Sequence, residues 1–207
     1  SYIIGSGREN FVKVLATQFP EEAEGIKAYV DELFDITERI PLFNLRPGIA
    51  DMTGEYGRFS MPADRLIAKH VRNEVLRELL AYLNPIYSGS PGHSPAYVHA
   101  LINVLFISGA SRFVGGSQQL ADALAGCVTD RGGQIVAGDP VQDITVENKA
   151  ITAVTTKSGR TFTPQLVISS IHPVSLLKIL PSNTFTTAFT NRLNSIPNSF
   201  SAFSLYI

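Results

Sequence analysis

Disulfides and membrane-spanning segments are what this sequence most plainly lacks. Its 207 residues include one cysteine, Cys127, which excludes an internal disulfide and favours a reducing compartment. Because Cys127 falls on the apolar side of an expected helix, we interpret it as a buried small hydrophobic residue rather than a nucleophile. The longest apolar run, AYVHALINVLFISGA, carries His99 and Asn103 and is shorter than the ~20 residues of a membrane span.

A strong net charge is also missing. The formal net charge is −1 and both signs are interspersed, so we expect no basic stripe and no nucleic-acid partner. The first residues do not show a basic segment followed by an apolar run, so we expect no secretory signal and a cytoplasmic location. The four histidines are not spaced as metal ligands, and we expect no metal site. We interpret His99, on an apolar helix, as a core histidine with its hydrogen bonds satisfied.

The first half of the chain has the apolar spacing of helices. Hydrophobic residues make up 44% of the sequence, which is enough to bury a core. The spacing predicts helices over residues 8–19, 20–40, 60–71, 73–83 and 94–107, with a Gly- and Pro-rich loop over 41–60. The last of these helices is apolar nearly all round, so we expect it to be buried.

After Gly115–Gly116 the pattern changes. A helix over 117–133 places Leu120, Leu124 and Val128 on one face and closes at a pair of glycines. Strands are predicted over 134–138, 141–147, 150–157, 166–171 and 199–207, and short helices over 172–181 and 185–196. The expected fold class is therefore α/β, in the sense of mixed α and β: a helical body joined to a small strand-rich unit.

One stretch near the start, YIIGSGREN, looks like a dinucleotide-binding turn but lacks parts of it. That fingerprint needs a small residue three positions after its second glycine, where this sequence has Asn10. The residues that follow are helical rather than a second parallel strand, so we interpret Gly5–Gly7 as a turn. The serine-hydrolase elbow and the P-loop lysine are missing as well. Spacing nominates no acid pair for acid–base work, and the catalytic residues remain unknown.

The stretch from Phe113 to Pro173 carries a resemblance to a known family. Its sequence, FVGGSQQLADALAGCVTDRGGQIVAGDPVQDITVENKAITAVTTKSGRTFTPQLVISSIHP, resembles the central part of FAD-dependent phytoene desaturases, carotenoid isomerases and retinol saturases. Flavin amine oxidases are more distant relatives of this group. The match is an ordered set: GG-S-x-x-L, a helix, GG, P-V-x-x-I, a hairpin, then V-I-S-S-x-x-P. Upstream, FPEEAEGIKAYV and HALINVLFISGASRF add to the likeness, which covers about three quarters of the chain.

The resemblance implies a layout in which a substrate domain interrupts a flavin domain. Residues 1–111 would form a mainly helical substrate or lid domain, residues 112–175 a partial FAD-binding segment, and residues 176–207 a return into the substrate domain. Val141 would offer its backbone to the adenine edge, with Pro140 fixing the strand end. Ser169, Ser170 and Pro173 would flank the same end of the cofactor.

The resemblance also implies a lipophilic substrate. Gly115–Gly116 would mark the point where the chain crosses from one domain to the other, close to the substrate cavity and the flavin. The residues that we expect to border the cavity are Tyr97, Leu101, Leu105, Gly109, Ser111, Gly115 and Gly116. The implied partner is an apolar small molecule, and peripheral membrane contact stays open because such substrates partition into lipid.

The implied function is FAD-dependent oxidoreduction of an apolar isoprenoid or polyene-like substrate, with the flavin carrying the hydride. Two alternatives remain: a flavin amine oxidase-like enzyme, and a non-catalytic binding or partner module. The chain opens on SYII and closes on FSAFSLYI, both strand-like, so we expect it to be a piece of a longer protein. FAD would belong to the full-length protein. We expect this piece alone to be inactive and to bind FAD weakly or not at all.

Overall fold

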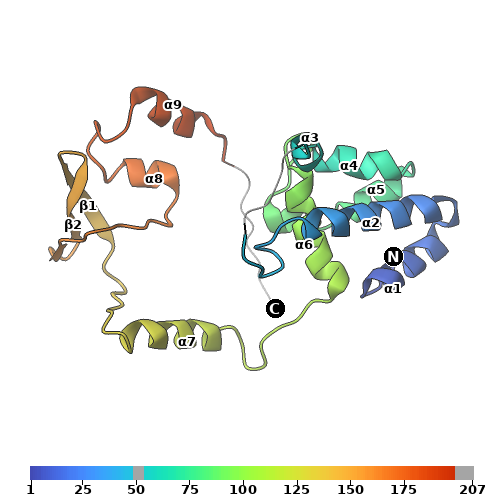
Figure 1. Cartoon of the computed structure of the whole chain (residues 1–207), viewed down its shortest axis with the longest axis horizontal. Coiled ribbons are helices and arrows are strands. Elements are labelled where there is room, and N and C mark those ends of the chain that lie inside the picture. Colours follow the sequence, from blue (N-terminus) through green and yellow to red (C-terminus); the bar gives the residue numbers. More distant parts are fainter. Residues whose placement is uncertain (49–53, 199–207) are drawn as a thin grey trace. The chain divides into compact units, whose positions relative to one another are not determined.

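The computed structural model describes residues 1–48 and 54–198, which divide into two compact units (Figure 1). The described part of unit 1 is 1–48 and 54–112, and that of unit 2 is 113–198. Unit 1 is built of helices, and unit 2 combines helices with a small sheet. This confirms the mixed α and β fold class. The predicted functional division at 111, 175 and 207 stays a prediction, although the described residues 176–198 belong to unit 2.

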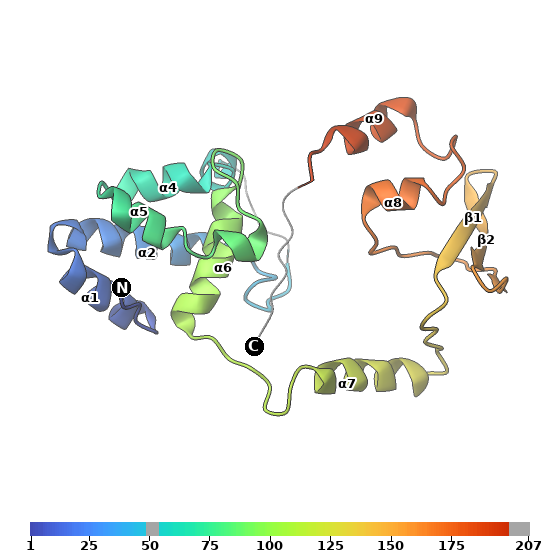
Figure 2. The same cartoon turned by 180° about the vertical axis from the view of Figure 1, so that it is seen from behind.

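Most helices of unit 1 lie close to the ranges that the apolar spacing predicts, but α3 falls inside the predicted loop over 41–60 and η2 was not predicted. They are α1 (Arg8–Gln18), η1 (Pro20–Glu22), α2 (Ala23–Glu38), α3 (Tyr56–Phe59), α4 (Ala63–His70), α5 (Glu74–Leu80), η2 (Asn84–Tyr87) and α6 (Ala96–Ser108). Helix α2 packs against α1, α4 and α6, as the view from behind shows (Figure 2). Its fully buried residues Tyr29, Val30 and Leu33 form the middle of the core.

Close contact between α2 and α4 depends on a glycine. A Cβ atom at Gly25 would lie 2.2 Å from the carbonyl oxygen of His70, so the two backbones could not approach this closely with any larger residue. Glu22 reinforces the same region, because its carboxylate accepts hydrogen bonds from the backbone N–H groups of Arg72 and Asn73 at 2.9 and 2.6 Å. Asn73 in turn caps α5 through its side-chain oxygen.

Two expectations for unit 1 are wrong. Residues 1–4 do not form a strand; the side-chain amide of Gln18 instead pairs with both the N–H and the C=O of Ile3, at 3.0 and 2.8 Å. Helix α6 is not buried all round, since Leu105 and Phe106 are 53% and 39% exposed. Only the face with His99, Ala100, Asn103, Val104 and Ile107 enters the core.

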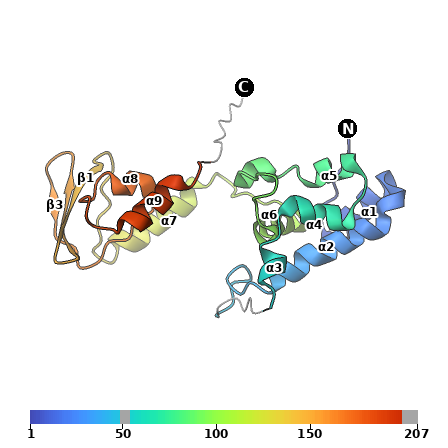
Figure 3. The same ribbon diagram turned by 90° about the horizontal axis from the view of Figure 1, so that it is seen from above.

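Unit 2 contains α7 (Gln118–Thr129), β1 (Val141–Glu147), β2 (Ala150–Thr156), β3 (Thr161–Phe162), α8 (Pro173–Leu177) and α9 (Thr187–Ser195). The three strands form an antiparallel sheet in the order β1-β2-β3, visible from above in Figure 3. Asn148 and Lys149 join β1 to β2 with φ of 52° and 64°, the left-handed pair of a tight hairpin turn. The predicted hairpin is thereby confirmed, whereas β3 was not predicted because two residues are too short to show alternation.

Two other predicted strands of unit 2 are wrong, and the one over 199–207 lies outside the described residues. Residues 134–138 and 166–171 are irregular, because no described strand pairs with either segment. In the second segment only Val167 is half-buried, whereas residues 168–171 are all exposed.

Cys127 is exposed, so the expectation that it is buried is also wrong. The reason is that α7 has no buried residue at all, and its apolar face with Leu120, Leu124 and Val128 is open. No helix among residues 1–48 and 54–198 is long and apolar enough to cross a membrane.

Candidate functional site

The predicted adenine-facing strand lies at an edge of the sheet. Strand β1 has β2 as its neighbour on one side, and in the described part of the chain no strand pairs with its other side. One outside contact reaches it: the N–H of Ile144 donates to the C=O of Ile179 at 2.9 Å. Val141, the first residue of β1, is 42% exposed.

The hydrogen-bond pattern shows which way the backbone of Val141 points. Val141 is opposite Thr156, yet the N–H of Thr156 donates away from β1, to the C=O of Arg160. The neighbouring bond, from Lys157 N–H to Pro140 C=O at 2.9 Å, is the one that joins the strands here. Because backbone groups alternate sides along an antiparallel ladder, the N–H and C=O of Val141 point to the open edge.

These groups fit what an adenine ring would need. A backbone donor and acceptor side by side can pair with the polar edge of the base without a charged side chain. The neighbouring turn is fixed by Asp139, whose carboxylate accepts from the hydroxyl of Ser158 at 2.6 Å and from its N–H at 3.0 Å. The hydrogen bond from the Ser158 hydroxyl is the main cause that lowers the pKa of the Asp139 carboxyl, and weaker hydrogen bonds add to it. Pro140 and Val141 are thus the residues that could hold the base.

The other residues expected beside the cofactor are dispersed. Ser169 lines a cavity of about 590 Å³ together with Ile144 and Val146 of β1. Ser170 is exposed and does not line it, and Pro173 begins α8. Ser169 therefore lies near β1, but Ser169, Ser170 and Pro173 do not lie together around Val141. Their roles at the cofactor stay predictions.

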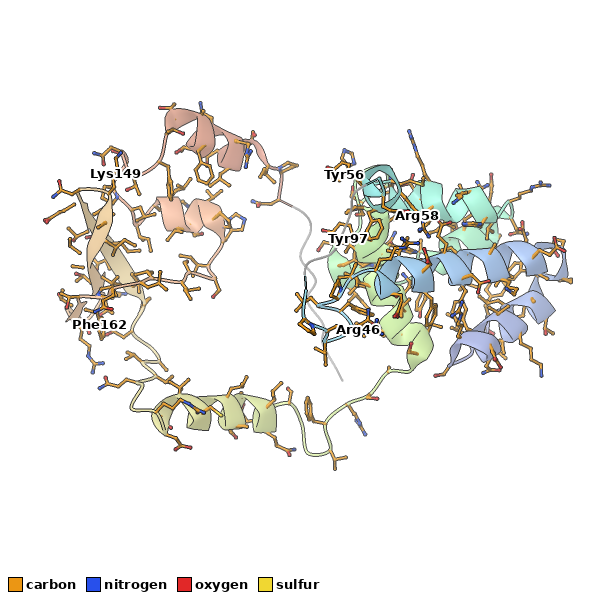
Figure 4. The ribbon with its side chains drawn as sticks, viewed as in Figure 1. Arg46, Tyr56, Arg58, Tyr97, Lys149 and Phe162 are labelled. Atoms are coloured by element: carbon orange, nitrogen blue, oxygen red, sulfur yellow. The ribbon has the colours of Figure 1, made fainter. Side chains whose placement is uncertain are left out.

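The expected cavity wall forms a stripe on α6. Tyr97, Leu101 and Leu105 are four residues apart, so they lie on one helix face. Tyr97 and Leu105 are 38% and 53% exposed, and Leu101 is half-buried. Figure 4 marks Tyr97 on this helix. Within unit 1 the stripe is open, and none of the three residues lines a described cavity.

The chain beyond α6 contains the predicted small residues. Gly109, with φ of 127°, ends α6, and Ser111 is exposed just after it. Gly115 and Gly116 have φ of 88° and 95°, which disfavour any other residue whatever surrounds them. They lie just beyond the boundary between Arg112 and Phe113. The side-chain amide of Gln119, which the sequence analysis missed, donates to the C=O of Val114 and holds this turn onto α7.

A buried network of hydrogen-bonded side chains in unit 1 was not predicted either, although His99 itself was expected in the core. The hydroxyl of Tyr29 lies 2.7 Å from Nε2 of His99, and that of Tyr87 lies 2.9 Å from Nδ1. Tyr87 donates to Asn84, so it accepts from Nδ1–H, and Tyr29 then donates to Nε2. Burial lowers the pKa of His99 to about 4 and raises that of Tyr87 to about 12, so the ring stays neutral.

Glu32 gathers a second polar group in unit 1. Its side chain is 7% exposed and contacts Arg58 and Lys69 at 3.0 and 2.7 Å, and His70 as well. Burial alone would raise the pKa of this carboxyl, but the hydrogen bonds from Lys69, His70 and Arg58 outweigh it and lower the pKa to about 2. Figure 4 labels Arg58 near α2, the helix that contains Glu32. The described residues contain no cluster of His, Cys, Asp and Glu that could hold a metal ion.

Comparison with known proteins places this arrangement in a family. The family described as flavin containing amine oxidoreductase matches residues 9–201, and the chain belongs to it. A similar protein is the all-trans-retinol 13,14-reductase of Danio rerio, 25% identical over 157 residues. The alignment covers 69% of this chain and 26% of the zebrafish protein, so the chain spans about a quarter of that relative's length. The resemblance expected from the sequence is thereby confirmed.

Proposed function

We propose that the chain is part of a FAD-dependent oxidoreductase of the desaturase, isomerase or saturase type. Its substrate would be an apolar isoprenoid or polyene-like molecule. Membership of the flavin family supports the cofactor. The similarity to a protein whose name specifies all-trans-retinol supports the substrate class.

The observation that carries the substrate class is the open apolar stripe on α6. Tyr97 and Leu105 present apolar surface to the outside of unit 1, on a helix whose other face is fixed in the core by His99 and Ile107. A rigid helix with one free apolar face is suited to be the wall of a cavity for a lipophilic molecule. The stripe offers no carboxylate or amine, so it would position the substrate by shape and exclude water.

The chemistry that FAD supplies when bound is hydride transfer. The residues of this chain would orient the reactants. Val141 would hold the adenine end through its outward N–H and C=O, with Pro140 limiting the motion of the strand end. The side chains of the α6 stripe would hold the substrate in place.

The cofactor half of the proposal can be tested at Val141 in the complete reading frame that contains this chain. Val141→Pro removes the outward N–H, yet an edge strand tolerates proline where the N–H points away from the sheet. We therefore expect Val141→Pro to fold with an unchanged circular dichroism spectrum and to purify with much less flavin absorbance. Val141→Ala keeps the backbone donor and should retain flavin. Equal flavin content in both variants would refute the assignment of Val141.

The substrate half can be tested at Leu105. We expect Leu105→Asp to raise KM for all-trans-retinol about tenfold or more, because the charge must be desolvated against an apolar ligand. Val75→Asp, at a residue of similar exposure on α5, is the matched control and should leave KM unchanged. Turnover of benzylamine in place of the polyene would favour the amine oxidase alternative. A complete protein that folds and takes up no flavin would favour a non-catalytic module.

A further inference from the structure

The largest described cavity of unit 2 has the composition of a ligand site. It encloses about 590 Å³, within the range of small-molecule pockets. Its wall is mainly aliphatic and aromatic, with Ile144, Val146, Ile151, Val167, Leu176 and Phe185. All of these residues belong to unit 2, so the cavity is complete within that unit.

The polar lining of this cavity carries positive charge and no negative charge. Lys149 is its single charged residue, and no acidic residue is among its described lining. Lys149 has no ion pair with the described part of the chain, and the side-chain amide of Asn183 has no hydrogen bond there. Two uncommitted donors therefore belong to the lining of a mainly apolar cavity, and that lining includes no competing anion.

Both donors lie in connecting segments that line the cavity. Lys149 belongs to the hairpin turn between β1 and β2, and Asn183 to the segment that leads into α9. Figure 4 shows Lys149 at the tip of the hairpin, beside that segment. Thr186 lines the cavity as well, and its Oγ1 accepts from Phe189 N–H, which leaves its hydroxyl proton free to be donated.

We propose that this cavity binds a long-chain monocarboxylate. The carboxylate would accept from the ammonium of Lys149 and the amide of Asn183, and the hydrocarbon chain would lie against the wall formed by β1, β2 and α8. A carboxylate accepts several hydrogen bonds and carries the one charge that Lys149 can neutralise. The proposal does not rest on the proposed function, since it needs neither flavin nor the stripe on α6.

The test titrates the complete chain with cis-parinaric acid, whose fluorescence rises in an apolar site, and with its uncharged methyl ester. We expect saturable binding of the acid, and binding of the ester weakened about tenfold for the loss of one charge-assisted contact. Lys149→Gln should weaken the acid about tenfold and leave the ester unchanged. Lys157→Gln, just beyond the other end of β2, is the matched control and should bind both ligands as the parent does.

Lys149→Gly separates binding from folding. Glycine adopts the left-handed conformation of this turn more easily than lysine, so the variant should keep or stabilise the hairpin while binding the acid about tenfold more weakly. Acid and ester bound equally, or Lys149 and Lys157 variants behaving alike, would overturn the proposal. Displacement of parinarate by FAD would assign the cavity to the cofactor and would overturn it too.

Discussion

Unit 1 and unit 2 hold their elements together by different means. In unit 1 the helices share a core, and Ile26, Leu33 and Leu66 are fully buried in it. In the described part of unit 2 the only buried hydrophobic residue is Ile144. Unit 2 also contains large apolar residues, but they stay open to solvent: Leu124 and Ile168 are 59% and 89% exposed.

This difference shows which interactions stabilise each unit. Unit 2 is held mainly by a few local features, the left-handed turn at Asn148 and Lys149 and the Thr186 cap of α9, and by the hydrogen bonds between Asp139 and Ser158. Such features form a hairpin or a helix turn without a core, but they leave apolar surface uncovered. Unit 1 adds long-range packing, which supplies most of the stability of a domain.

The largest expected effect contrasts one leucine from each unit. Leu33→Ala should lower the free energy of unfolding of unit 1 by about 4 kcal/mol, because it leaves a cavity in a filled core. Leu124→Ala on α7 should change stability by less than about 0.5 kcal/mol, since that side chain is 59% exposed. Urea unfolding followed by tyrosine fluorescence measures the first substitution, because six of the seven tyrosines lie between residues 2 and 97, and hydrogen exchange within α7 measures the second. Similar losses from both substitutions would mean that α7 is packed in solution.

The second prediction concerns acid. The pKa of His99 falls from 6.5 to about 4 on folding, so between these pH values the unfolded chain binds a proton that the folded chain does not. Unit 1 should therefore lose up to about 3 kcal/mol as pH falls through this window. His99→Gln should flatten the dependence of the free energy of unfolding on pH between 6.5 and 4.

A second group, the Glu32 carboxyl, titrates in a lower pH window and serves as the control. Because the folded pKa of Glu32 is lowered from 4.5 to about 2, its contribution is present above pH 4.5 and is lost as pH falls towards 2. Glu32→Gln should leave the slope between pH 6.5 and 4.5 intact. If His99→Gln keeps the full slope in that window, the buried neutral imidazole is not its source.

The same contrast explains how far the sequence could predict the fold. The longer helices of unit 1 and the hairpin of unit 2 follow from local periodicity and turn residues, and both were predicted, whereas the single turns α3 and η2 were not. The strands over 134–138 and 166–171 needed neighbours that the described chain does not supply, so their apolar patterns were not sufficient. The prediction that α6 is buried all round was wrong for a related reason, because composition cannot show that one apolar face of a helix stays exposed.

For the candidate site, the sequence could name residues but not their surroundings. Spacing placed Tyr97, Leu101 and Leu105 on one face, and the resemblance pointed to Val141, yet only the ladder showed which way its backbone faces. Contacts over long sequence separations, such as Tyr29 with His99, leave no local signal. The cavity around Lys149 likewise depends on three separate segments meeting in space.

A third prediction uses two helical glycines. Gly25→Ala should destabilise unit 1 by about 2 kcal/mol, because the new methyl group would collide with the backbone of α4. Gly126→Ala on α7 should instead raise helix stability by up to about 1 kcal/mol, since nothing lies within 4 Å of its Cβ position. Hydrogen exchange measured by mass spectrometry follows both changes, with faster exchange expected in α2 of the first variant and slower exchange in α7 of the second. Slower exchange in α2 after Gly25→Ala would show that the close approach to His70 is absent in solution.

The smallest effect compares two helix caps of the same kind. Asn73 caps α5 by accepting from Leu76 N–H at 3.1 Å, and Thr186 caps α9 by accepting from Phe189 N–H at 3.3 Å. Removing a cap costs about 1 kcal/mol. Because α5 belongs to the cooperative core, Asn73→Ala should lower the urea midpoint of all of unit 1. Thr186→Ala should speed exchange only within α9, since no shared core transmits the loss. Exchange that rises throughout unit 2 after Thr186→Ala would show that unit 2 unfolds as one cooperative body, and the distinction between the units would then be one of degree.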